Sequence, residues 1–218
     1  MRISHKYKFI FFCSPKTASE SIRKLLTPYS DVLSTVYKER TSENPFYSHM
    51  SPYETEYIFK KKGWDFDAYN KFVFVRNPWA RLVSLYIMII ESEKCPEKDN
   101  KSDFLNWLYT IKTYGSGGGG DDSKRWRKYG TYSLDNYTSD NHGKILVNRV
   151  LKLENIKHEL IPFLKELGLP DIENINVPYI NNRAKKYHYT DYYTKEAEQY
   201  IEKLYSYDIK TFNYIFGK

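Results

Sequence analysis

Two short polar segments of the chain carry residue types that bind anions. The first is Ser14-Pro-Lys-Thr-Ala-Ser-Glu-Ser21, which holds one lysine among several hydroxyl residues. Backbone N–H groups at the start of a helix lack partners and lie at the positive end of the helix dipole, so such a turn attracts phosphate or sulfate. Lys16 adds a positive charge, and Thr17, Ser19 and Ser21 add hydroxyl donors. The alternative is an ordinary capped helix with a surface lysine.

The second polar segment begins at Arg76 and includes Ser84, eight residues later. Arg76 ends an apolar run, and Arg81 lies on the same predicted helix face as Ser84. A guanidinium and a hydroxyl together suit a second phosphate. Taken singly, Arg76 also suits a salt bridge, and Ser84 a hydrogen bond to a carbonyl one helical turn earlier. Two such segments in one chain favour a shared ligand with two anionic ends.

Each polar segment follows an apolar run and precedes a helical pattern. Residues 7–13 and 71–76 are apolar throughout most of their length, which is typical of central strands covered on both faces. We expect one helix to follow Thr17, with Thr17 and Glu20 as a capping box, and another to span 79–91. A further strand is predicted at 145–153, and further helices at 51–62, 102–111, 155–167 and 195–205. Ser51 and Glu54 are the predicted reciprocal caps of the helix at 51–62.

This alternation predicts an α/β fold, a three-layer sandwich with a central parallel sheet and a P-loop-like strand-turn-helix. Because ligands of such sheets bind at the carboxyl ends of the strands, both polar segments are expected at the same edge. The length of 218 residues suits a single domain over 1–218, with a flexible glycine-rich insertion around 113–130.

Composition narrows the class of protein. Hydrophobic residues make up 41% and charged residues 28%, which excludes a disordered chain. Lysine and arginine number 34 against 27 acids, and the net charge of +7 favours anionic partners. Two cysteines cannot form a disulfide framework, no apolar run is long enough to span a bilayer, and no signal peptide is visible, so we expect a soluble, cytoplasmic protein.

A metal-dependent nucleotide site is the natural alternative. The Walker pattern needs glycine before its lysine, but Pro15 precedes Lys16 and the turn contains no glycine. The second strand ends in Arg76, where a Mg²⁺-binding acid would be required. A P-loop-type phosphotransferase is therefore disfavoured, and a non-enzymatic binder of acidic polymers is a third reading that the net charge alone supports.

The two polar segments resemble the cofactor signatures of sulfotransferases, and in particular the carbohydrate type that includes heparan sulfate 2-O-sulfotransferases. Pro15-Lys-Thr-Ala-Ser-Glu-Ser21 is similar to the family's 5′-phosphosulfate loop, and Arg76-Asn-Pro-Trp-Ala-Arg-Leu-Val-Ser-Leu-Tyr86 to its 3′-phosphate motif. The C-terminal part is also similar, with Leu153-Glu-Asn155, Tyr192-Tyr193 and Asp208.

The resemblance implies 3′-phosphoadenosine 5′-phosphosulfate (PAPS) as donor, its 3′,5′-bisphosphate (PAP) as product, and no metal. Lys16 would contact the phosphosulfate near its bridging oxygen, and Arg76 and Ser84 would hold the 3′-phosphate. The 5′-phosphate would be wrapped, mostly by N–H groups, within the loop formed by Pro15, Thr17, Ala18, Ser19, Glu20 and Ser21. Glu20 departs from the hydroxyl residue often found there, and we expect it to turn away and cap the helix.

The resemblance also places a histidine base near His49, with Glu54 as the alternative. A late segment resembles the loop that covers the donor, where Arg183, Lys185 and Lys186 would reach the 3′-phosphate and Tyr187 the adenine. Lys124, Arg125 and Arg127 are candidates for an acceptor channel, or for a solvated charge run. The implied activity is sulfuryl transfer to a hydroxyl of a sugar or glycan, with tyrosine or small-molecule acceptors left open. We expect no binding of nucleic acid.

Overall fold

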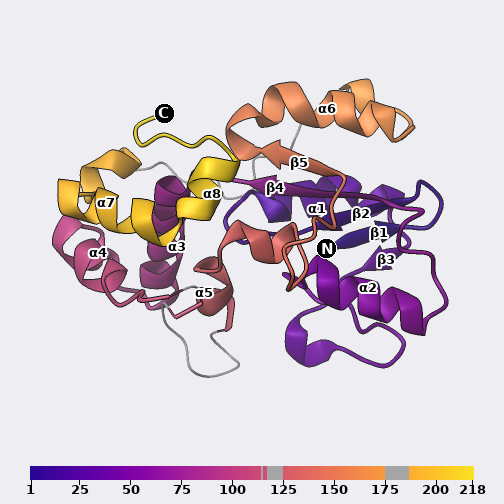
Figure 1. The fold of residues 1–218 in the computed structure, drawn as a ribbon, viewed down its shortest axis with the longest axis horizontal. Coiled ribbons are helices and arrows are strands. Elements are labelled where there is room, and N and C mark those ends of the chain that lie inside the picture. The colour runs from indigo at the N-terminus through magenta and orange to yellow at the C-terminus, as the bar shows by residue number, and fades with distance from the viewer. Residues whose placement is uncertain (114, 117–124, 175–186) are drawn as a thin grey trace. The chain divides into compact units, whose positions relative to one another are not determined.

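The computed structural model describes residues 1–113, 115–116, 125–174 and 187–218 (Figure 1). The chain divides into two compact units, which are treated separately below. The first unit comprises Met1–Val75 and Asp135–Asn182, and the second Arg76–Leu134 and Arg183–Lys218. The glycines at 117–120, in the predicted flexible insertion, lie outside the described residues, whereas Arg125–Gly130 of that insertion forms helix α5.

The first unit is built on a five-stranded sheet in the order β3-β1-β2-β4-β5. The strands are β1 (Arg2–Ser4), β2 (Phe9–Phe12), β3 (Val32–Leu33), β4 (Asn70–Val75) and β5 (Arg149–Lys152). Strands β2, β4 and β5 are parallel neighbours, which confirms the predicted parallel centre and the α/β class. Strands β1 and β3 add an antiparallel side to the sheet that the sequence patterns did not predict.

Aromatic residues of the central strands form the core of the first unit. Alternate residues of β2 and β4, including Phe11 and Phe72, pack with α1 (Ser19–Leu26) and α6 (Ile156–Glu166). The ring centroids of Phe11 and Phe72 lie 5.1 Å apart, and Phe163 of α6 lies 4.9 Å from Phe72. Burying each such ring contributes about 1.5–3 kcal/mol. This core fixes the end of β2, from which the first polar segment departs.

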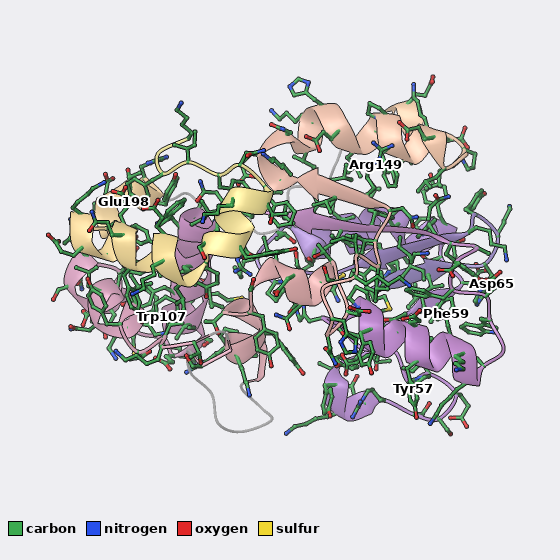
Figure 2. The ribbon with its side chains drawn as sticks, in the orientation of Figure 1. Tyr57, Phe59, Asp65, Trp107, Arg149 and Glu198 are labelled. Carbon is green, nitrogen blue, oxygen red and sulfur yellow. The ribbon has the colours of Figure 1, made fainter. Side chains whose placement is uncertain are left out.

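Helix α2 (Pro52–Lys61) lies on the other side of the sheet from α6 (Figure 1). Ser51 and Glu54 form the predicted capping box, and Pro52 occupies the first turn. Figure 2 shows Phe59 on this helix, where it packs edge-on against Trp64, Phe66 and Tyr69, while Tyr57 of the same helix is exposed.

The second unit is helical and is organised around α3 (Pro78–Ser92). Asn77 caps this helix, since its Oδ1 accepts hydrogen bonds from the N–H groups of Trp79 and Ala80. Most of α3 is buried, as its apolar composition predicts, and Gly130 allows α5 to approach Leu85 closely. The other helices of the unit are α4 (Lys101–Leu108), α7 (Lys195–Leu204) and α8 (Ser206–Thr211).

Short 3₁₀ turns connect these elements at Thr27–Tyr29, Tyr37–Glu39, Pro96–Lys98 (η3), Leu134–Tyr137, Leu153–Asn155, Ile172–Asn174 and Tyr189–Tyr192 (η8). The predicted strand at 145–153 is confirmed only over its second half, because residues 145–148 lead into the sheet without joining its ladder. Among the described helices, none has the length and apolar composition needed to cross a bilayer.

Candidate active site

The first polar segment forms a left-handed turn between β2 and α1. Lys16 and Ala18 have φ angles of 64° and 57°, although neither is glycine. Left-handed residues that alternate with ordinary ones gather successive backbone N–H groups into a concave anion-binding surface. Ala18 is also the N-cap of α1, so the helix dipole adds to the positive potential of this turn. The geometry therefore fits a phosphate or sulfate group.

The hydroxyl groups of this segment hold the turn together. Thr17 Oγ1 and Ser19 Oγ both donate to the carbonyl oxygen of Ser14, at 2.8 and 2.7 Å. Ser14 Oγ in turn donates to the carbonyl of Phe74, which links the end of β2 to β4. The side chains of Thr17 and Ser19 thus stabilise the turn. The groups left to meet the predicted anion are then the backbone N–H groups and Lys16.

The predicted capping box of Thr17 and Glu20 is wrong. Helix α1 begins at Ser19, one residue after the left-handed Ala18, and has no side-chain cap. Thr17 does not cap because the N-cap position is occupied by Ala18, one residue later in the chain. Glu20 lies exposed in the first turn of α1, where a carboxylate interacts favourably with the helix dipole.

His49 is anchored beside this turn. Its Nδ1 lies 2.7 Å from the carbonyl oxygen of Cys13, the residue that precedes Ser14. Because a carbonyl only accepts hydrogen bonds, Nδ1 must carry the proton, and the lone pair of the neutral ring lies on Nε2. His49 itself has a φ of 67°, so the backbone is held in an uncommon conformation to present the ring.

Several neighbours keep the His49 ring neutral. Desolvation is the largest cause, and together with the positive charges of the N-terminus, Arg23 and Lys16 it lowers the pKa of His49 from 6.5 to about 4. The hydrogen bond to Cys13 opposes this shift. At neutral pH the ring is therefore an unprotonated base, and the charge of Lys16 is close enough to affect it.

Glu54, the alternative base, is committed to other contacts. Its carboxylate accepts hydrogen bonds from the hydroxyl of Tyr47 at 2.8 and 2.9 Å and from the N–H and hydroxyl groups of Ser51. These contacts give Glu54 a structural role as the partner of Ser51 in the capping box of α2. Among the two predicted bases, His49 is the one without such capping contacts, and its catalytic role stays a prediction.

In the second unit, Arg76 directly precedes the N-cap of α3, and Ser84 lies within that helix. Both side chains are half-buried. Within the part of the chain that the structure describes, the Ser84 hydroxyl makes no hydrogen bond, so the carbonyl one turn earlier does not explain it. The Ser84 hydroxyl is therefore not committed to a neighbour among the described residues, and its role at the 3′-phosphate stays a prediction.

A buried ion pair fixes the helix that carries Ser84. Arg81 and Asp208 are both fully buried, with Nη2 and Oδ2 3.7 Å apart. Asp208 also accepts hydrogen bonds from the Ser133 hydroxyl at 2.6 Å and from the N–H of Leu134. The pair joins α3 to α8 and to residues 133–134. No sequence pattern predicted this pairing, although an arginine inside an apolar helix indicates a buried acid partner.

The structure describes only some of the residues predicted to cover the nucleotide or to line an acceptor channel. Arg183, Lys185, Lys186 and Lys124 lie outside the described residues, as does the side chain of Arg125. Tyr187 is exposed, with its ring 5.9 Å from that of Tyr192. Arg127 forms an ion pair with Glu93 at 2.8 Å, so it is not a solvated charge.

Together, the mixed sheet and its polar strand-turn-helix define an α/β protein with a turn whose backbone geometry fits an anion. The chain belongs to the sulfotransferase family, whose family model matches residues 1–215. This match confirms the predicted sulfotransferase and does not favour the phosphotransferase alternative. The narrower resemblance to the carbohydrate type stays a prediction.

One curated relative is an uncharacterized protein of Archaeoglobus fulgidus (strain ATCC 49558 / DSM 4304 / JCM 9628 / NBRC 100126 / VC-16). It is 28% identical to this chain over 114 residues, which cover 51% of this chain and 78% of the relative. No solved structure matches the chain.

Proposed function

We propose that this sulfotransferase moves the sulfuryl group of PAPS to an acceptor hydroxyl of a sugar or glycan. The observation that carries the proposal is the hydrogen bond from His49 to Cys13, which sets a neutral histidine beside an anion-binding turn. The turn supplies the donor end of the reaction, and the histidine supplies a base for the acceptor.

Lys16 and the backbone of the turn would hold the 5′-phosphosulfate. When the sulfuryl group leaves, the bond between sulfur and the bridging oxygen breaks, and its electron pair stays on the 5′-phosphate. Negative charge grows on the bridging oxygen during this step, and a nearby lysine stabilises it. The left-handed conformations of Lys16 and Ala18 hold the turn in shape before the donor binds.

His49 would remove the proton from the acceptor hydroxyl. The proton moves to Nε2 as the acceptor oxygen forms its bond to sulfur, and the products are a sulfate ester and PAP. The hydrogen bond to Cys13 keeps the ring in the required tautomer. A base whose pKa is lowered to about 4 stays unprotonated near neutral pH, and so is ready to accept the proton.

The same proposal assigns the 3′-phosphate to Arg76 and Ser84, through charge-assisted hydrogen bonds. By resemblance, Arg183, Lys185 and Tyr187 would cover the nucleotide. A sugar acceptor is supported by the resemblance to the carbohydrate type and by the net charge of +7, which favours acidic glycans. A cytoplasmic location is supported by the two free cysteines, Cys13 and Cys95.

The test is release of PAP from PAPS in the presence of chelator and a panel of sugars and glycans. We expect release that depends on an acceptor and falls by about 10²–10⁴ in His49→Gln. His158→Gln, an exposed histidine on α6, is the matched control and should retain full activity. Absence of PAP release with every acceptor, or equal activity in the two variants, would refute the proposal.

A further inference from the structure

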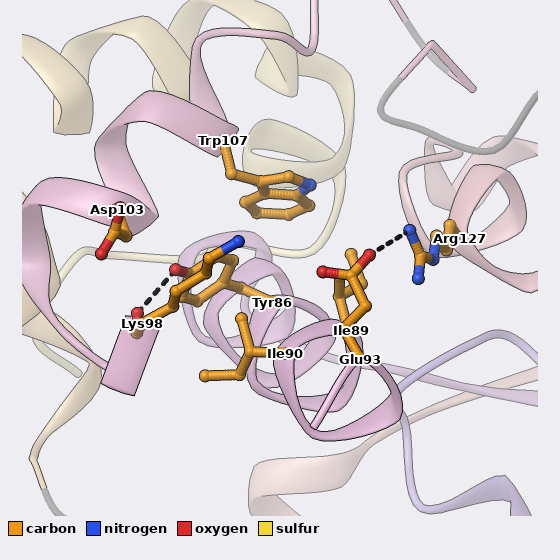
Figure 3. Close-up of a pocket in the computed structure, with 8 residues that line it drawn as sticks. All are labelled: Tyr86, Ile89, Ile90, Glu93, Lys98, Asp103, Trp107 and Arg127. Carbon is orange, nitrogen blue, oxygen red and sulfur yellow. Dashed lines mark hydrogen bonds and ion pairs between the residues drawn. The ribbon is translucent and has the colours of Figure 1, made fainter. Parts of the chain in front are cut away.

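The second unit contains a pocket of about 230 Å³ along the C-terminal half of α3 (Figure 3). Four of its lining residues come from α3 or its C-cap, and the others from η3, α4 and α5. They are Tyr86, Ile89, Ile90, Glu93, Lys98, Asp103, Trp107 and Arg127. None of them is assigned to the donor or to a catalytic step above, although Arg127 is one of the predicted candidates for an acceptor channel.

This pocket and Ser84 lie on opposite faces of α3. At 3.6 residues per turn, Tyr86, Ile89, Ile90 and Glu93 are rotated from Ser84 by about 200°, 140°, 240° and 180° around the helix axis. All four therefore lie within about 60° of the face directly opposite Ser84. The pocket is a separate site from the one proposed for the 3′-phosphate.

The interior of the pocket is aromatic and aliphatic. The ring of Trp107 lies 5.4 Å from that of Tyr86, inclined by 37°, and in the view of Figure 3 Tyr86 lies between Trp107 and Ile90. The hydroxyl of Tyr86 donates to the carbonyl of Lys98 at 2.7 Å, so this tyrosine presents its ring to the pocket. Trp107 is half-buried and offers a ring surface to an incoming ligand. The interior suits one flat, apolar ligand face.

The edge of the pocket carries two acids and two bases. Arg127 pairs with Glu93 at 2.8 Å, and Figure 3 shows Lys98 and Asp103 toward the other end. Their formal charges cancel, so a strongly anionic or cationic ligand meets a like charge as well as an opposite one. A neutral ligand with hydroxyl groups meets both donors and acceptors. The charges therefore select against ions and favour a polyhydroxylated molecule.

We propose that this pocket binds a single neutral sugar ring, with its C–H face against Trp107 and its hydroxyls toward Glu93, Arg127 and Asp103. The volume supports this size of ligand, because pockets for drug-sized molecules usually measure about 300–1,000 Å³. A flat aromatic ligand would also stack on Trp107, but would leave most of the charged edge unused. The site does not depend on the proposed function, since it needs neither donor nor transfer.

The test is to measure the binding of methyl glycosides of glucose, galactose and N-acetylglucosamine by calorimetry and by saturation-transfer NMR. We expect at least one of these neutral sugars to bind in the millimolar range. Trp107→Ala should weaken binding at least about tenfold, and Trp107→Phe, which keeps a ring, by less than about threefold. Tyr109→Ala, at the end of the same helix but outside the pocket, is the matched control and should bind like the wild type.

Additional probes separate the alternatives. Glu93→Gln should also weaken sugar binding, and it keeps the size of the side chain. This variant tests the site even if Trp107→Ala does not fold. If a trisaccharide and its monosaccharide bind equally well, the ligand of the pocket is a free sugar. If the trisaccharide binds more tightly, the ligand is a glycan chain. Both outcomes support the site. Absence of neutral sugar binding, binding only of glucuronate, glucosamine or adenosine, or undiminished binding in Trp107→Ala would overturn the proposal.

Discussion

The Nδ1 atom of His49 donates a 2.7 Å hydrogen bond to the backbone carbonyl of Cys13. Cys13 follows β2 and precedes the polar turn, so this bond ties the proposed base to the start of the proposed donor loop. It also fixes the tautomer, since the proton on Nδ1 leaves the lone pair on Nε2. The proposed base and the proposed leaving-group site therefore belong to the same unit of the protein.

The lowered pKa of His49 predicts a pH dependence of stability. The unfolded histidine, with a pKa near 6.5, takes up its proton before the native one, whose pKa is about 4. The wild type should therefore lose stability relative to His49→Gln as the pH falls from 6.5 to 4, by up to about 3 kcal/mol. Urea unfolding of both proteins across this range measures the difference. Parallel stability profiles would mean that the pKa of His49 is not lowered.

The left-handed conformation of Ala18 predicts an unusual response to glycine. An L-residue pays about 1–2 kcal/mol to adopt this conformation, whereas glycine adopts it freely. Ala18→Gly should therefore destabilise the protein less than Ala197→Gly, by at least about 1 kcal/mol. Ala197 is the matched control because it lies buried in the regular helix α7. Chemical denaturation checks this, and equal losses of stability would argue against a left-handed Ala18.

Ser84 should contribute to ligand binding without contributing to stability. Its hydroxyl has no hydrogen-bond partner among the described residues, so Ser84→Ala should change the free energy of unfolding by less than about 0.5 kcal/mol. A lost hydrogen bond to the 3′-phosphate should weaken PAP binding about tenfold. Ser92→Ala on the same helix, where the hydroxyl donates to Ile89, should leave PAP binding unchanged. Unaltered PAP affinity in Ser84→Ala would remove Ser84 from the donor site.

The buried pair of Arg81 and Asp208 should behave as one energetic unit. Asp208→Asn leaves the guanidinium buried without its counter-charge, which should cost about 3–5 kcal/mol. Adding Arg81→Met removes the unpaired charge and should recover at least about 2 kcal/mol of that loss. A double-mutant cycle by urea unfolding measures the coupling. Additive losses would show that the two side chains do not stabilise each other.

The central strands and their following helices could be predicted because their signals are local. Residues 9–12 and 70–75 are apolar throughout most of their length, and Ser51, Pro52 and Glu54 mark the start of α2 within four residues. Strands β1 and β3 have only three and two residues and are held by pairing across the sheet. Such short strands carry no periodicity that a sequence pattern can detect.

The contacts within the candidate site were harder to predict, because several of them join residues that are far apart in the sequence. The residue types at 14–21 predicted an anion site, but they did not predict that the hydroxyls of Thr17 and Ser19 donate to the carbonyl of Ser14. The bond from His49 to Cys13 joins residues 36 positions apart, and Arg81 and Asp208 are separated still further. These contacts depend on the tertiary fold, which no local spacing encodes.

The most direct test of the donor site is calorimetric titration with PAP and with adenosine 5′-phosphate, in the absence of metal. We expect PAP to bind more tightly, because Arg76 and Ser84 are proposed to hold its 3′-phosphate, and we expect Arg76→Ala to abolish this preference. A hundredfold excess of PAP over its Kd should stabilise the wild type by about 2.7 kcal/mol, which raises Tm by roughly 5–11 °C. Equal affinity for the two nucleotides, or an unchanged preference in Arg76→Ala, would contradict the account.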